Sequence, residues 1–588
     1  MSENQAMTEE QKKKAHVGYQ MYDWARSAFE TSVVVAILPV WFAYLFVLAN
    51  GQEVSIAGMT QTADGLFAFV TGLAAISVAI LSPGLGVIAD RIPVKQVMLR
   101  WFTIVGAGAT ILLGAAIILP METRWVWLAV MFFLANVGAN AASVFYNALL
   151  PHICETDEEL DRVSTKAFMY GYVGGGLLLA VHLGLVLGVT GDWVVPFCLS
   201  SSGVWWFGFA IYTFKGIPEP EIVNPIDNLS LGSATKLALS EMAKTIKDFR
   251  STYKVLGLYL ISYLLFIDGI NSVTALGGIY GASVLGVPEI SNMAVILLIQ
   301  FVAFPSAAFF IWFSKKTSTK TTIIVTCAIW CVVILGAISF APLALENHED
   351  HDFMVVQNED GVSFTISVDY ENFSIASGEA GSDAEFRNAV SHLYPPEEVN
   401  STTELYEFTG ESRVLNQSEL DELLQYLPST RFSLSVSNGE EFESFLGEDH
   451  PVSLGDGYID AIPIWTRDNI WQPMNIGISI QWLLIGVGAG FLLGGSQGMA
   501  RSLFAQMVPE SRSAEFFGFI GFFGKVAAFI GPWMYFAIGN VADSRTAIMS
   551  ILMLIVAGVI LLFFVDVEEG ARVAAEEDAK FRATQSED

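Results

Sequence analysis

The stretch LGLYLISYLLFIDGINSVTAL, residues Leu256 to Leu276, is one apolar run that carries Asp268 near its middle and Asn271 one helical turn later. It is long enough to cross a bilayer as a helix, which takes about 20 residues. A carboxylate at that depth costs roughly 2.5–3.5 kcal/mol on insertion scales and persists where it faces protein or water. We therefore expect a membrane helix whose Asp268 either lies beside a polar cavity or is bonded to a neighbouring helix.

The composition of the chain is typical of a polytopic membrane protein. Of the 588 residues, 53% are hydrophobic and only 15% are charged, whereas soluble proteins carry about 25% charged residues. The net charge of −30 is concentrated in residues 346–468, which hold 27 acidic residues, four arginines and no lysine. Phosphate affinity comes from Lys and Arg, so we expect no nucleic-acid partner.

Twelve apolar runs, six on each side of a polar linker, are each long enough to span a bilayer. They are Ser27–Leu48, Leu66–Ala89, Val97–Leu119, Trp125–Leu149, Phe168–Val189, Trp193–Phe214, Lys254–Leu276, Asn292–Phe313, Thr322–Leu343, Met474–Gly495, Phe516–Ile538 and Ala547–Val565. This pattern predicts an all-α polytopic membrane protein, with twelve helices in two six-helix bundles and a cavity between them.

The runs divide the chain into seven parts. These are an N-terminal segment (1–26), the first bundle (27–214), a linker (215–253), helices seven to nine (254–343), an acidic insert (344–468), helices ten to twelve (469–566) and a tail (567–588). With the N-terminus inside, the N-terminal flank, the even-numbered loops and the tail hold 23 of the 30 Lys and Arg residues. Cytoplasmic loops carry such an excess. We therefore expect an integral protein of the cell membrane, with both termini cytoplasmic and the insert outside.

Two polar segments have local patterns of their own. In the insert, FMVVQ-NEDG-VSFTISV predicts two strands around a turn, and Arg431–Val436 predicts a third strand. Ser382–Tyr394 and Ser418–Leu427 predict short helices, so the insert is expected to be a small soluble α+β domain. Its acids favour a solvated surface, with a ligand or protein partner left open. In the linker, helical spacing of apolar residues predicts an amphipathic helix, on Leu237, Met242, Ile246 and Phe249.

The turn after the second run, GVIADRIPVK, has the pattern G-x-x-x-D-R-x-x-x-[RK], which is the loop signature of the major facilitator superfamily. Its residues are Gly86, Asp90, Arg91 and Lys95. The glycine permits a close helix approach and the aspartate can pair with a neighbouring helix end. We expect this motif to control the conformation of the bundle, although a plain positive-inside turn would also carry such charges.

Further stretches narrow the resemblance. They are YDWARSAF (Tyr22–Phe29), FYNALLPHI (Phe145–Ile153), RVSTKAFMYGYVGGGLLL (Arg162–Leu179), LLFIDGINSV (Leu264–Val273) and the long block Gly494–Pro532. Together they resemble the vacuolar amino-acid effluxer (autophagy-related) branch of that superfamily and its prokaryotic relatives. The likeness covers the twelve-helix body. The chain departs from it at Arg26, where the family pattern has Asn, and in the acidic insert.

The resemblance implies alternating-access transport of amino acids or similar small solutes without ATP hydrolysis. With Asp268 inside a membrane helix, we expect a secondary active transporter that is linked to protons and moves amino acids or similar small polar solutes. No cofactor, bound metal or enzymatic activity is expected, and the sequence has no G-x-x-x-x-G-K-[ST], GxSxG or HExxH motif. The alternative is a membrane receptor or sensor that binds its ligand through the external insert.

Several polar residues inside the runs are candidates for the solute and proton pathway. Asn136, Asn140 and Asn147 share one helix face. Their amides can bind a zwitterion or bond between helices, and the pattern does not separate these roles. Gln497 and Arg501 are four apart where the tenth run ends, and we expect Arg501 to form an ion pair at the cytoplasmic gate.

Three further charged residues complete the set of candidates. Asp23 and Glu30 are seven apart at the inner end of the first run, and Arg26 between them can neutralise Asp23. Lys525, in the eleventh run, needs a carboxylate because an unpaired ammonium is costly in a membrane. Asp268 is its expected partner.

Overall fold

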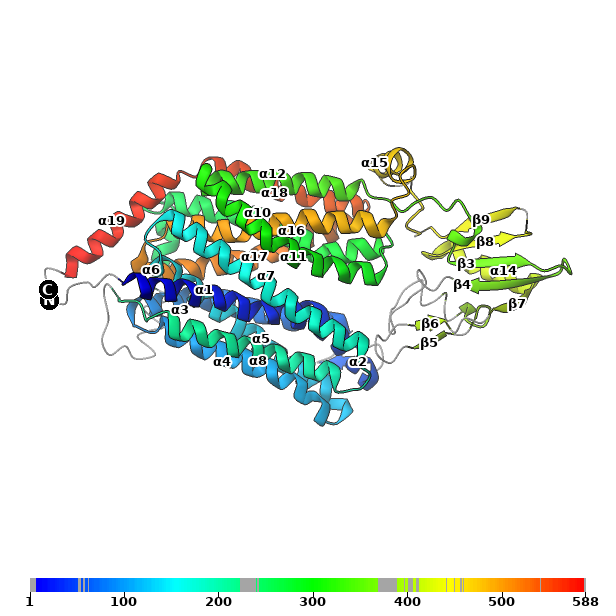
Figure 1. Cartoon of the computed structure of the whole chain (residues 1–588), viewed down its shortest axis with the longest axis horizontal. Coiled ribbons are helices and arrows are strands. Elements are labelled where there is room, and N and C mark those ends of the chain that lie inside the picture. The colour runs from blue at the N-terminus through cyan, green and yellow to red at the C-terminus, as the bar shows by residue number, and fades with distance from the viewer. Residues whose placement is uncertain are drawn as a thin grey trace.

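The computed structural model describes the chain except for residues 1–6, 51–53, 57–58, 62, 223–239, 241–242, 369–385, 387–388, 396, 400–405, 409–411, 440, 449, 455–456, 458, 540 and 586–588, and except for some side chains, among them 525–529. Its helices run along one elongated bundle with a β-rich unit at one end (Figure 1). Both termini lie at the other end (Figure 1). We call these the insert end and the terminal end.

The first half of the bundle, the N half, is blue to cyan in Figure 1. Its elements are α1 (Glu9–Ala28), η1 (Phe29–Ile37), α2 (Leu38–Asn50), β1 (Val54–Ile56), β2 (Met59–Gln61), α3 (Ala63–Arg91), α4 (Lys95–Leu113), η2 (Gly114–Ile118), α5 (Met121–Ala148), α6 (Leu150–Ile153), α7 (Asp157–Gly188) and α8 (Val194–Gly216). The first helix begins at Glu9 behind a Thr8 cap, well before the expected Ser27. It continues through the π-helical η1 into α2.

The second half, the C half, holds the remaining long helices and encloses the insert within its chain. Its elements are α10 (Lys254–Ser283), α11 (Glu289–Lys316), α12 (Thr319–Ile338), α16 (Ile478–Gln506), η6 (Glu510–Arg512), α17 (Ser513–Gly539), α18 (Ser544–Phe563) and α19 (Val567–Gln585). Eleven helical segments among the described residues are long and apolar enough to cross a membrane. The twelfth expected run is α17, a continuous helix of 27 residues, so the predicted twelve-helix architecture is confirmed.

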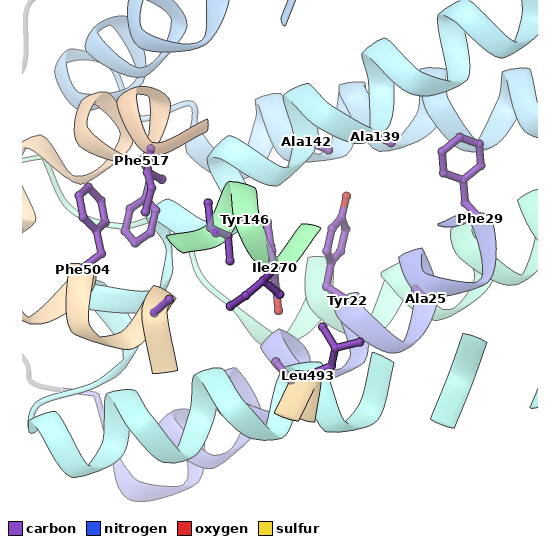
Figure 2. Close-up of a cluster of buried hydrophobic side chains, with 14 of the residues drawn as sticks. Tyr22, Ala25, Phe29, Ala139, Ala142, Tyr146, Ile270, Leu493, Phe504 and Phe517 are labelled. Atoms are coloured by element: carbon purple, nitrogen blue, oxygen red, sulfur yellow. The ribbon is translucent and has the colours of Figure 1, made fainter. Parts of the chain in front are cut away.

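The two halves meet along α3 against α17, and along α7 against α11 and α16. Figure 2 shows part of the shared core, where Tyr22 and Tyr146 of the N half lie close to Ile270 and Leu493 of the C half. All four side chains are buried or nearly so. One hydrophobic cluster runs through both halves, so groups that lie between them are enclosed by protein on both sides.

The insert folds around its own small core. Its elements are η3 (His348–Asp350), β3 (Phe353–Gln357), β4 (Ser363–Val368), β5 (Glu397–Val399), β6 (Tyr406–Phe408), β7 (Arg413–Asn416), α14 (Gln417–Tyr426), η4 (Leu427–Ser429), β8 (Ser433–Ser437), β9 (Phe442–Leu446), α15 (Ala461–Thr466) and η5 (Arg467–Trp471). The main sheet has the order β7-β4-β3-β8-β9, and only the β3–β8 pair is parallel. The predicted hairpin is β3–β4, and the helix predicted from Ser418 is α14.

Two sequence predictions fall partly outside the described residues. Of the predicted helix Ser382–Tyr394, residues 386 and 389–394 are described, and 386, 389 and 390 are helical. Of the linker helix, residues 243–248 are described and helical. Ile246 is exposed, whereas the ring of Phe249 packs against Phe516 and Phe519 of α17. The described end of the linker therefore rests on the C half at the terminal end.

Candidate functional site: a polar cavity above two latches

A cavity of about 190 Å³ lies between the two halves. Side chains from α1, α5, α7, α10, α16 and α17 line it, so both halves contribute. They are Asp23, Arg26, Ser143, Tyr146, Asn147, Phe168, Tyr263, Ile267, Asn271, Gln497, Arg501, Phe517 and Ile520. We call it the central cavity. A neighbouring cavity of about 150 Å³, the side cavity, shares Arg26, Ser143, Asn147 and Phe517 with it.

Arg501 of α16 lines the central cavity and connects the two halves there. Its Nη2 lies 3.3 Å from Asp23 Oδ2 of α1, and its Nε donates to Ser164 Oγ at 2.8 Å. Its Nη1 donates to Asn147 Oδ1 at 3.2 Å. The guanidinium carbon also lies 4.3 Å from the ring centre of Phe168. Arg501 therefore forms an ion pair, as expected, and its partner Asp23 lies in the N half; its role at a gate stays a prediction.

The partner expected for Asp23 from the sequence is wrong. Arg26 pairs with Glu30, with Nη2 and Oε1 2.5 Å apart, and Asp23 pairs with Arg501. Asp23 and Arg501 are 478 positions apart, so local spacing favoured the nearer arginine. The cavity therefore contains one ion pair between the halves, while the second arginine is paired within its own half.

Nearer the terminal end, residues at the turn between α3 and α4 form hydrogen bonds with the N-terminus of α17. The Asp90 carboxylate accepts the backbone N–H groups of Ala514 at 3.1 Å and Glu515 at 2.8 Å. It also lies 2.8 Å from Lys95 Nζ, and both side chains are almost fully buried. Lys95 Nζ in turn donates to Ser513 Oγ at 2.9 Å. A carboxylate at a helix N-terminus satisfies N–H groups that have no partner within the helix.

His152 of α6 completes this cluster. Its Nε2 accepts from Lys95 Nζ at 3.0 Å and lies 2.9 Å from Ser513 Oγ. Burial, with Lys95 adding to it, holds the pKa of His152 well below its usual value. The imidazole is therefore neutral and able to accept. We use the name charged latch for Asp90, Lys95, His152 and Ser513 together with the first N–H groups of α17.

A second cluster ties the start of α7 to the C half. Asp161 Oδ1 accepts from Ser502 Oγ at 2.6 Å and from Gln506 Nε2 at 3.4 Å. Thr319 Oγ1 donates to both Asp161 oxygens, at 2.9 and 3.0 Å. All of these donors are neutral, so we name this cluster, Asp161 with Thr319, Ser502 and Gln506, the hydroxyl latch. Asp161 was not among the sequence candidates, although an acid near the start of an apolar helix is a readable signal.

The predicted motif residues lie at these contacts. A Cβ on Gly86 would lie 2.2 Å from the Ala514 carbonyl oxygen, so only glycine lets α3 approach α17 this closely. Asp90 and Lys95 form the charged latch, as described above. Arg91, at the end of α3, is half-buried; it takes part in interactions but is not one of the residues that we assign to the charged latch.

The remaining candidates are distributed around the cavities. Asn147, Asn271 and Gln497 line the central cavity, whereas Asn140 lines only the side cavity. Asn136 donates to the Phe132 carbonyl oxygen of its own helix. The three asparagines of α5 therefore have different surroundings despite their shared face.

Asp268 is fully buried but does not line either cavity. Ser272 Oγ donates to its Oδ1 at 3.1 Å. Its Oδ2 has no hydrogen-bond partner among the described residues. Ile267 beside it and Asn271 one turn on do line the central cavity. The side chain of Lys525 lies outside the described residues, so its expected pairing with Asp268 stays a prediction.

Comparison with known proteins identifies relatives of this architecture. The family described as "Vacuole effluxer Atg22 like" matches residues 11–358 and 458–575. An uncharacterized MFS-type transporter, YxiO of Bacillus subtilis, is 24% identical over 332 residues, which cover 55% of this chain and 73% of that protein. Autophagy-related protein 22 of Botryotinia fuckeliana is 31% identical over 125 residues, 20% of this chain and 18% of that protein.

Solved structures share the fold at low sequence identity. The major facilitator proton:xylose symporter XylE, bound to 6-bromo-6-deoxy-D-glucose, has a TM-score of 0.53 at 9% identity, with 95% of each chain covered. A bacterial homologue of the iron transporter ferroportin, in an outward-facing state, has a TM-score of 0.50 at 10% identity over 95% of this chain and 99% of that chain.

Proposed function

The chain belongs to the vacuole effluxer Atg22-like family of major facilitator transporters, and we propose that it moves amino acids or similar small polar solutes by alternating access, coupled to protons. The observation that carries the proposal is the central cavity, which both halves line and in which the Asp23–Arg501 ion pair joins one half to the other. A cavity between two packed halves is where rocking of one half against the other exposes a solute first to one side and then to the other.

Lysine and arginine counts favour a cytoplasmic terminal end. On that orientation the described contacts close the cytoplasmic side, and the solute enters from the side of the insert. Release to the cytoplasm requires both latches and the Asp23–Arg501 pair to open. The direction of net flow then depends on the gradients.

A reversible cross-link tests alternating access directly. Lys315 Nζ of α11 lies 2.5 Å from Glu158 Oε1 of α7, and both side chains are partly exposed at the terminal end. The double variant Glu158→Cys/Lys315→Cys, joined by a short cleavable thiol reagent, holds the two halves together there. In proteoliposomes, uptake of a labelled amino-acid mixture should stop on cross-linking and return on cleavage. The two single-cysteine variants are the controls, and undiminished uptake by cross-linked protein would refute the proposal.

We propose that Asp268 is the residue that couples transport to protons. The carboxyl group is enclosed on the helix that lines the cavity, and it accepts a hydrogen bond from Ser272 Oγ. An enclosed carboxylate in a membrane protein is costly, and such residues commonly carry protons or ions. Asp268→Asn should remove the dependence of uptake on a pH gradient while the protein remains folded in the membrane. A variant that keeps gradient-driven accumulation would exclude Asp268 as the coupling group.

Removing the insert distinguishes a transporter from the alternative, a receptor that binds its ligand through the insert. The family match omits residues 359–457, so the unit shared with relatives is the helical body. A chain lacking residues 346–467, with the ends joined by a short flexible linker, should therefore still transport. Transport lost from a correctly inserted deletion variant would instead favour a ligand-binding role for the insert.

A further inference from the structure

Arg26 is the cation at the junction of the two cavities. It lines both of them, and it is the only charged residue among those that line the side cavity. In the central cavity, the other two charges belong to Asp23 and Arg501, which neutralise each other at 3.3 Å. It is also the position where the sequence departs from the asparagine of the family pattern.

The guanidinium of Arg26 is only partly used by the protein. Nη2 donates to Oε1 of Glu30, which lies four residues later in the same half. Nε is buried and has no hydrogen-bond acceptor among the described residues. A guanidinium carries five N–H donors in a fixed planar fork, and a buried donor that has no acceptor destabilises the structure that holds it. The arrangement therefore favours an additional acceptor that enters with the solute.

The neighbouring polar groups do not compete for that acceptor. Ser82 donates to Val78, Ser143 to Ala139 and Asn140 to Asn136, in each case to a backbone carbonyl of its own helix. Asn147 accepts from Arg501 through Oδ1, and its Nδ2 donates no hydrogen bond within the described part of the chain. Among the described residues that line both cavities, the donors without a described acceptor therefore belong to Arg26 and Asn147, and both suit an oxygen ligand.

We propose that Arg26 binds a carboxylate group of the transported solute, with Glu30 holding the guanidinium in position. A carboxylate offers two oxygens that match the guanidinium fork. Paired hydrogen bonds between these two charged groups are stronger than the bonds that a neutral amide would form with the same guanidinium. The inference rests on the proposed function and narrows it: the solute must carry a carboxylate, and an otherwise identical molecule with an amide in its place is rejected.

The test compares matched carboxylates and amides on purified, full-length protein. The probes are lactate against lactamide and alanine against alaninamide, a monoanion pair and an amino-acid pair, measured by thermal shift, because a bound ligand raises apparent stability by mass action. At least one carboxylate should stabilise the protein at a concentration about tenfold below its amide, and which pair responds distinguishes a simple anion from a zwitterion. Arg26→Asn should abolish that difference.

Three variants separate a binding role from a structural one. Arg26→Lys keeps the charge and loses the fork, so carboxylate binding should weaken about tenfold while a preference over the amide remains. Glu30→Gln weakens the bond that holds the guanidinium in position, so carboxylate binding should weaken, but by less than in Arg26→Asn, and the preference over the amide should remain. Arg100→Asn removes an exposed arginine of α4 and should bind as the parent does.

Two results would overturn the proposal: a parent protein that binds neither carboxylate better than its amide, or an Arg26→Asn variant that keeps the preference. Neither depends on transport, because binding is measured in detergent. If the cross-link at Glu158 and Lys315 leaves uptake unchanged, alternating access fails while the carboxylate preference stands. If the preference is absent but the cross-link stops uptake, only the role of Arg26 fails.

Discussion

The two latches do the same mechanical task with different chemistry. Each holds the first turn of a helix in one half against the opposite half, α17 against the N half and α7 against the C half. In the charged latch, Asp90 is paired with Lys95 at 2.8 Å and both are almost fully buried. In the hydroxyl latch, Asp161 is bonded to neutral hydroxyl and amide donors, with no cation within ion-pair distance among the described residues.

Because of this difference, we expect the two latches to contribute unequal free energies to the closed state. Removing one partner of a buried ion pair leaves the other charge without compensation, which costs about 3–5 kcal/mol. Removing one neutral donor costs nearer to 1–3 kcal/mol. The charged latch should therefore dominate closure of the terminal end, and the hydroxyl latch should adjust it. Four experiments test that ranking.

The largest effect is expected from Asp90→Ala. It leaves Lys95 buried without its carboxylate and strips the α17 N-terminus of its acceptor, so the closed terminal end should lose about 3–5 kcal/mol and become the minor state. Spin labels at Lys215 and Lys316, exposed at the terminal end of opposite halves, should report longer distances. Asp192→Asn, at an exposed carboxylate, is the control, and an unchanged distance distribution in Asp90→Ala would break the ranking.

Gly86→Ala should have the next largest effect. The added methyl would lie 2.2 Å from the Ala514 carbonyl oxygen, and neither backbone can yield as a side chain does. Overpacking of this kind costs about 1–3 kcal/mol, so the label distance should again lengthen. Gly108→Ala is the matched control, because a Cβ there meets nothing within 4 Å. Equal behaviour of the two variants would contradict the close approach of α3 and α17.

Asp161→Asn should have a smaller effect. The asparagine carbonyl still accepts from Ser502 or Thr319, so the loss is the charge-assisted part of these bonds, about 1 kcal/mol. The same spin labels should show a minor rise in the open population. Should Asp161→Asn open the terminal end as far as Asp90→Ala does, the neutral donors would be holding the helix as firmly as the buried ion pair.

The smallest effect is a pH dependence of the charged latch. The pKa of His152 is lowered from 6.5 in the closed structure by burial and by Lys95. When the terminal end opens, the imidazole regains a more ordinary pKa and takes up a proton below about pH 6.5, so acidification favours opening and the closed state is most stable above that pH. His152→Gln should flatten the change in label distance between pH 7.5 and 5.5. A slope equal to that of the parent would exclude His152 as its source.

The architecture was predictable because each helix must be apolar over a bilayer's length, and the runs from Leu66 onward lie within the observed helices or overlap them closely. The motif around Asp90 and the need of Arg501 for an ion-pair partner were predictable from residue type and spacing. The partners were not, because Asp23 and Arg501 come together only when the N half packs against the C half, with α7 lying against α16. Asp161 was missed for a similar reason: its hydroxyl partners are unremarkable residues on two other helices.

The position of the insert has a practical consequence. Its chain leaves α12 and returns to α16, and Gln481 of α16 bonds the backbone of Ala341 while Arg545 of α18 bonds that of Phe340. These bonds fasten the outgoing stem to the C half, and the returning stem is tied to it because Trp471 Nε1 donates to the Ser339 carbonyl oxygen at 3.0 Å. On the alternating access proposed above, a folded unit attached to the C half turns with that half. The tilt of the insert relative to the membrane plane in single-particle images would then report the conformation of the helical body.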